Sequence, residues 1–96
     1  MKVTLQDIES AYAKIKNEIQ RTPVQISTSA SKIIGSEIFF KMENEQTTGS
    51  FKLRGAMNKV ISLSAEERKR GIVASSAGNH AQGIAYAARK FGVEAN

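Results

Sequence analysis

A lysine at the start of a predicted helix is the residue whose type and position best suit a nucleophilic reaction with a carbonyl group. Lys52 follows Phe51 in a glycine- and serine-rich turn, residues 47–56, and lies in the first turn of the helix that this segment opens. The positive end of a helix dipole disfavours a charged lysine there, and an uncharged lysine amine attacks carbonyl carbons and forms Schiff bases. Lys52 is therefore a candidate nucleophile. Position alone favours a plainer interpretation, in which it is one of fourteen basic residues on a solvated surface.

A second turn of similar composition, residues 75–83, opens another helix. The first backbone N–H groups of a helix have no partner inside it, so a helix start favours anions. Two such starts in one short chain give two candidate anion sites. His80, the only histidine, lies in the second of them. One histidine with no cysteine and scattered carboxylates gives no metal-ligand spacing.

Hydrophobic periodicity predicts the amino-terminal elements. A helix is expected from Thr4, its N-cap, to Arg21, with Thr22-Pro23 as its end. Residues 23–31 form an extended segment rich in small hydroxyl residues, in which residues 27–29 either make a loop or cap a short helix before Gly35. The apolar stripe of the first helix consists of Leu5, Ile8, Tyr12, Ile15 and Ile19.

The rest of the chain alternates strands and helices. Residues 37–43 and 72–75 predict strands, and a third strand begins at Val93. Ser64 and Glu67 form a capping box for a helix that stops at Gly71. This alternation is typical of an α/β fold with parallel strands, incomplete at the C-terminus. Two further helices are expected at residues 50–63 and 79–91, the first of them turning Phe51, Leu53, Met57 and Val60 inward.

Composition narrows the class of protein. A chain of 96 residues has room for one small core, and its 41 % hydrophobic content is ordinary for a globular domain. No apolar run approaches the ~20 residues that span a bilayer. The net charge of +5 is dispersed among acidic residues, as in residues 66–70, which argues against nucleic-acid binding. Without cysteines or a visible secretory signal, the expected location is the cytoplasm.

Four motifs in a fixed order carry a resemblance to a known family. They are Arg21-Thr22-Pro23-Val24, residues 39–44, residues 48–56 and residues 75–83. Together they resemble the N-terminal part of the serine/threonine dehydratases, the fold type II pyridoxal-phosphate (PLP) enzymes that include threonine ammonia-lyase and serine racemase. The resemblance implies that residues 1–96 are the N-terminal portion of a PLP-dependent catalytic domain. The loop that holds the cofactor phosphate would then lie beyond Asn96.

The resemblance also implies roles for individual residues. Lys52 would form the Schiff base with PLP and then act as the base at the substrate Cα. Phe51 would pack against the cofactor ring, and Asn79 would donate a hydrogen bond to its phenolic oxygen. The helix start at residues 76–80 would bind the carboxylate of an amino-acid substrate. The residues involved there are Ser76, Gly78, Asn79 and His80, with His80 expected to contribute its main chain rather than its side chain.

One position favours elimination over racemisation. Serine racemases of this family carry a serine just before the Gly-Asn-His motif, where it acts as acid and base on the opposite cofactor face; here the residue is Ala77. The implied reaction is a β-elimination on L-threonine, or L-serine, that gives 2-oxobutanoate, or pyruvate, and ammonia. Alternatives are a racemase or β-replacement enzyme and a non-catalytic fragment.

In some relatives a nucleotide effector binds near the positions of Ser27, Thr28 and Thr48, and we keep this as a minority hypothesis. A metal site, where relatives have one, would use residues outside this chain. The full-length protein is expected to be a homo-oligomer with no nucleic-acid or membrane partner.

Overall fold

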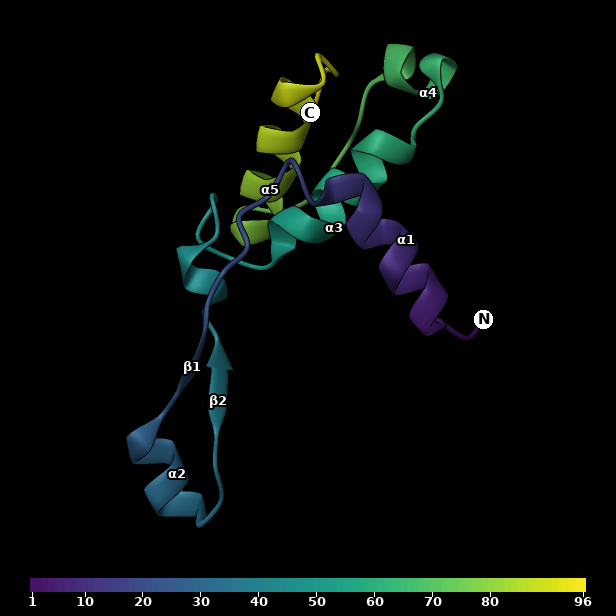
Figure 1. Ribbon diagram of the computed structural model, residues 1–96. Helices are drawn as coiled ribbons and strands as arrows, with labels where there is room; N and C mark the ends of the chain where they lie inside the picture. The colour runs from purple at the N-terminus through teal and green to yellow at the C-terminus, as the bar shows by residue number, and fades with distance from the viewer.

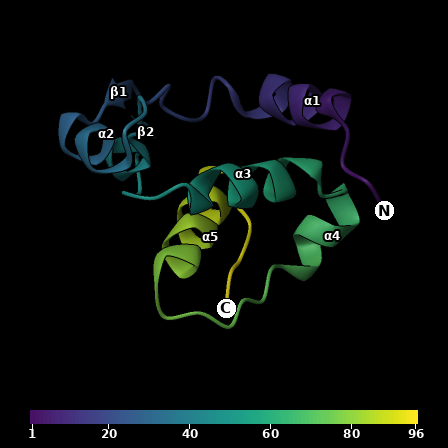
Figure 2. The same cartoon turned by 90° about the horizontal axis from the view of Figure 1, so that it is seen from below.

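The computed structural model describes residues 1–96, and two crossed helices organise it (Figure 1). Figure 2 shows α1 and the segment β1–α2–β2 on one side of α3, with α5 on the other side. We call the projecting segment, residues 24–41, the arm. None of the helices has the length and apolar content needed to cross a bilayer. The elements are α1 (Leu5–Ile15), β1 (Val24–Ile26), α2 (Thr28–Ile34), β2 (Phe39–Lys41), the 3-10 helix η1 (Glu43–Glu45), α3 (Lys52–Ser62), α4 (Ala65–Arg70) and α5 (Asn79–Lys90).

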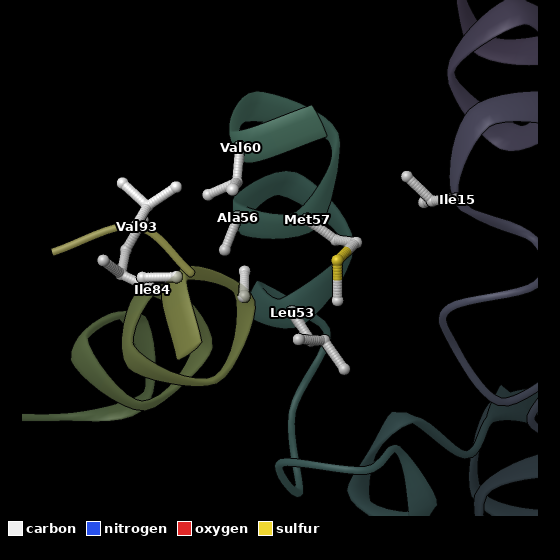
Figure 3. Packing of buried hydrophobic residues seen from close by; sticks show 9 residues of the cluster. Ile15, Leu53, Ala56, Met57, Val60, Ile84 and Val93 are labelled. Carbon is white, nitrogen blue, oxygen red and sulfur yellow. The ribbon is translucent and has the colours of Figure 1, made fainter. Parts of the chain in front are cut away.

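The hydrophobic core lies where α3 packs on α5. Leu53, Met57 and Val60 recur at helical spacing on one face of α3 and are fully buried, as predicted. Figure 3 shows Ile84 of α5, and Val93 from the segment after α5, beside the buried residues of α3. The complete cluster consists of Ile15, Leu53, Ala56, Met57, Val60, Ile84, Ala87, Ala88 and Val93.

Helix α1 begins where the sequence predicted and ends earlier. Thr4 forms a capping box with Asp7. The helix stops at Ile15, so the predicted continuation to Arg21 is wrong. The reason is tertiary: the backbone N–H of Gln20 donates to Gln46 Oε1 at 2.9 Å, and Gln46 Nε2 donates to the Gln20 carbonyl at 2.9 Å. These two bonds occupy the backbone N–H and carbonyl of Gln20, so neither group makes a helical bond, and the chain passes through a turn at residues 16–18 instead.

The arm is a short antiparallel ladder closed by a helix. In β1 and β2, Val24 lies opposite Lys41 and Ile26 opposite Phe39. Ser27 caps α2 by accepting from the N–H of Ala30, and Gly35 ends the helix with φ 79°. Of the two alternatives for residues 27–29, a loop or a helix cap, the structure shows the cap. The strand predicted at residues 37–43 is shorter than expected, Phe39–Lys41, and it pairs antiparallel with β1 rather than in parallel.

Parallel pairing occurs at one place, between Ile72 and Ala95. The N–H of Ile72 donates to the Glu94 carbonyl at 2.8 Å, and the N–H of Asn96 donates to the Ile72 carbonyl at 2.9 Å. The two strands predicted at residues 72–75 and from Val93 thus pair as a single bridge rather than as a full ladder. The Ser64–Glu67 capping box of α4 is present as predicted.

Candidate functional site

Lys52 is the first residue of α3, and its side chain is exposed. Its Nζ lies 5.2 Å from the centre of the Phe51 ring. Phe51 is 60 % exposed, so the prediction that it faces the core is wrong. Leu53 takes the core position, and at 3.6 residues per turn a side chain two positions earlier points about 200° away from it. Phe51 and Lys52 therefore both face outward at the start of α3.

A pocket of about 280 Å³ brings Lys52 together with the start of α5. Its residues come from the first turns of the two helices: Phe51, Lys52, Gly55 and Ala56 at α3, and His80 at α5. From the two turns alone the sequence predicted two separate anion sites; the pocket brings the residues of both turns, Lys52 and His80, to one place. Ser76, in contrast, lines a separate, smaller pocket with Ala74 and Asn96, and Gly78 and Asn79 line neither.

The start of α5 presents unpaired backbone donors. Gly78 occupies the N-cap without a side-chain cap, and its own N–H donates to Ser76 Oγ at 3.3 Å. The N–H groups of Asn79, His80 and Ala81 have no acceptor within the protein. This segment is exposed, so these donors remain available to a carboxylate or phosphate group.

Gly83 sets the distance between the two helix starts. A Cβ placed on Gly83 would lie 3.3 Å from the Lys52 carbonyl carbon and oxygen and 3.3 Å from the Leu53 nitrogen. Only the absence of a side chain lets α5 come this close to the backbone that carries Lys52. We did not single out Gly83 from the sequence. Its signal is a glycine inside a predicted helix, which costs stability unless packing requires it.

A partly buried charge network fixes the loop that leads into α3. Arg54 donates to both carboxylate oxygens of Glu43, from Nη2 at 2.8 Å and from Nε at 2.9 Å, and Thr22 Oγ1 donates to Glu43 Oε1 at 2.6 Å. The hydrogen bonds from Arg54, helped by Thr22 and opposed by burial, lower the pKa of Glu43 from 4.5 to about 2. Glu43 is therefore ionised at neutral pH. It ties the extended segment and the end of β2 to α3 at Arg54, two residues after Lys52.

The three effector candidates are not gathered by any contact. Ser27 pairs with Ile38 at the far end of the ladder from Lys41, and Thr28 begins α2. Thr48 lies in the loop before α3, where its hydroxyl and that of Ser50 are buried without a hydrogen-bond partner. The nucleotide site therefore stays a prediction.

With this geometry established, comparison with known proteins identifies the family. Residues 15–96 match the family described as "Pyridoxal-phosphate dependent enzyme". The chain is 57 % identical over 93 residues to an L-threonine ammonia-lyase of Thermotoga maritima, and this covers 97 % of the chain and 23 % of that protein. It is 51 % identical over 94 residues to the L-threonine dehydratase catabolic TdcB of Staphylococcus aureus, covering 97 % of the chain and 27 % of the relative. A serine racemase of Dictyostelium discoideum is 46 % identical over 87 residues, with coverages of 91 % and 27 %.

Solved structures agree with these sequence matches. The serine racemase from Dictyostelium discoideum superposes with a TM-score of 0.91 at 44 % identity, covering 97 % of this chain and 30 % of that one. A threonine deaminase from T.th. gives a TM-score of 0.85 at 42 % identity, with coverages of 98 % and 33 %. The chain thus spans about a quarter to a third of the length of the relatives it matches. It has the fold of the corresponding part of the fold type II enzymes, and it belongs to the family of pyridoxal-phosphate dependent enzymes.

Proposed function

We propose that this chain supplies the cofactor-binding lysine of an enzyme that eliminates the hydroxyl group of L-threonine, and of L-serine, to give a 2-oxo acid and ammonia. The observation that carries the proposal is the outward-facing Lys52 amine in a pocket with Phe51 and His80, in a chain of this family. Residues 1–96 would then be one portion of a longer catalytic domain. The threonine ammonia-lyases among the relatives support the choice of substrate.

The residues around Lys52 suit the aldehyde and ring of PLP. The chain offers an amine for the carbonyl and, at 5.2 Å from it, an exposed aromatic face for stacking. The pocket volume, about 280 Å³, lies just below the ~300–1,000 Å³ typical of ligand sites. When bound, PLP acts as an electron sink that stabilises negative charge at the substrate Cα.

Each site residue then has a defined task. Lys52 Nζ would hold the cofactor through its aldehyde, and the same amine, when free, would be the base that removes the Cα proton. The side chain of Asn79 would donate to the phenolic oxygen of the cofactor. The free N–H groups at the start of α5, with Ser76 and Gly78 before them, would hold the substrate carboxylate. The side chain of His80 has no assigned proton transfer.

A racemase is the second candidate, because serine racemases are among the close relatives. Ala77 argues against it, since a methyl side chain transfers no proton on the face opposite Lys52. Elimination needs no second proton donor of this kind. We therefore propose elimination as the main reaction.

The test is to incubate the protein with PLP, reduce with borohydride and map the label over its nine lysines. We expect the label to concentrate on Lys52. Lys52→Ala should abolish this labelling, while Lys59→Ala, a change at an exposed lysine of the same helix, should leave it intact. Label spread evenly over the surface lysines would contradict the proposal that these residues form the cofactor site.

We further propose that the full-length protein works in the cytoplasm as a homo-oligomer on a small-molecule substrate. The cysteine-free sequence supports this location. Cell fractionation and sedimentation velocity would test the location and the assembly.

A further inference from the structure

A second pocket, of about 350 Å³, lies where α1, the segment after it, β2 and α3 meet. It shares no lining residue with the Lys52 pocket. Four of its six residues are cationic and one is a tyrosine. The lining consists of Tyr12, Lys16, Ile19, Arg21, Lys41 and Arg54.

The charges of this basic pocket are not balanced by carboxylates within residues 1–96. Arg54 is the only one of its four cations with a carboxylate partner, Glu43. Both carboxylate oxygens of Glu43 already accept hydrogen bonds, from Arg54 and Thr22. Lys41 Nζ donates to the neutral Thr22 carbonyl at 2.6 Å, and neither Lys16 nor Arg21 takes part in an ion pair. Three positively charged residues therefore line one pocket without an ion-pair partner, and an anion bound there would relieve the repulsion among them.

The backbone that carries Arg21 is held firmly. Its predecessor, Gln20, is bonded through both its N–H and its carbonyl to Gln46, and its successor, Thr22, is buried and bonded to Glu43. Arg21 itself is exposed and free to point toward a ligand. A guanidinium on a fixed backbone binds an oxyanion at a lower entropic cost than one on a mobile loop.

We propose that this basic pocket binds a phosphate-type oxyanion, held by Arg21, Lys16 and Lys41 with the Tyr12 hydroxyl as a further donor. Guanidinium and ammonium groups form charge-assisted hydrogen bonds with phosphate oxygens, and a planar guanidinium matches two of them at once. A dianionic phosphate neutralises more of the three unbalanced charges than a monocarboxylate does. The site is independent of the proposed lyase function, because it uses none of the residues around Lys52.

The test is an NMR titration of the protein with inorganic phosphate at low, constant ionic strength. We expect saturable shifts of the backbone amides of residues 16–21 and 41. Arg21→Gln should weaken phosphate binding about tenfold, the effect of losing one charge-assisted bond. Lys16→Gln, a second and independent change, should weaken it as well. Arg89→Gln removes the same charge from an exposed position on α5 and should change the affinity less than about twofold.

Two results would overturn the proposal. Equal losses in Arg21→Gln and Arg89→Gln would show that phosphate responds to net charge alone. Acetate binding as tightly as phosphate at the same ionic strength would exclude a phosphate-selective site. Urea midpoints of the three variants establish that each is folded before its affinity is compared.

Discussion

Glu43 is held by three hydrogen bonds, two from Arg54 and one from Thr22, and its carboxylate joins three segments of the chain. Its side chain is 15 % exposed, so solvent screens the pair less than it screens a surface ion pair. No local pattern in the sequence announces this contact, because its partners lie 11 and 21 residues away. The residue is therefore a structural anchor rather than part of the chemistry at Lys52.

Glu43→Gln should lower the free energy of unfolding by about 1–3 kcal/mol at pH 7, the range for hydrogen bonds to charged groups. Because folding depresses the pKa of Glu43 from 4.5 to about 2, its contribution is complete above about pH 5 and is lost as the pH falls toward 2. The difference between Glu43→Gln and the unmodified protein should therefore shrink over this range. Urea unfolding at successive pH values measures it.

Glu66→Gln serves as the matched control for Glu43. Glu66 is exposed in the first turn of α4 and forms no ion pair. Its substitution should change stability by less than about 0.5 kcal/mol, as is usual for surface changes. If Glu43→Gln lowered the free energy of unfolding by the same amount at every pH, packing rather than the charge would account for its effect.

At the scale of elements, the crossing of α3 and α5 decides how the two helix starts meet. Small residues on α5, Gly83 and Ala87, face α3 and are buried. The Gly83 contact involves backbone atoms of Lys52 and Leu53, which lie inside a helix and cannot turn aside as a flexible side chain can. The spacing between Lys52 and His80 therefore depends on this one glycine.

Gly83→Ala should destabilise the protein by about 1–3 kcal/mol, the usual cost of overpacking. Gly55→Ala is the control, because a Cβ there meets no atom within 4 Å. A helical glycine replaced by alanine without a clash gains about 0.5–1 kcal/mol, so this variant should be more stable. Urea unfolding of both variants distinguishes the two effects. An equal gain in stability for both would contradict the close-contact role of Gly83.

At the scale of the whole molecule, the chain is elongated. Its radius of gyration is 16.1 Å, compared with about 12.5 Å for a compact domain of this length. The arm projects from the α3–α5 core (Figure 1) and has no residue in the buried cluster. Only 13 of the 96 residues are buried, so large side chains such as Ile33, Phe39 and Phe40 remain exposed. The activity must therefore be tested on the full-length protein.

In the full-length protein we expect L-threonine to yield a 2-oxo acid and ammonia, and L-serine to yield D-serine only at the background rate of the assay. Ala77→Ser should raise D-serine formation by about a hundredfold or more, the lower range for a positioned proton donor. Ala85→Ser, at an exposed position on α5, should not. A chiral amino-acid assay measures the product. Racemase activity in the unmodified protein would contradict the proposal that Ala77 leaves the cofactor face opposite Lys52 without a proton donor.

The sequence by itself determined the features that depend on neighbouring residues. The caps at Thr4, Ser27 and Ser64, the left-handed end of α2 at Gly35 and the core face of α3 all follow from contacts within a few positions. The four motifs also identified the family before any geometry was known. The sequence also placed Lys52 and His80 in the first turns of two helices, because helix starts are readable from local signals.

Only the tertiary structure decided the features that join distant residues. Gln46 bonds to Gln20, in the segment after α1, from 26 positions away, and the close contact of Gly83 with the Lys52 backbone spans 31 positions. Phe51 faces solvent because Leu53 takes the place against α5. The basic pocket likewise gathers residues from α1 to α3. Such contacts depend on which surfaces pack together. Burial and charge across the whole chain decide that packing, and the hydrophobic periodicity of a single segment does not reveal it.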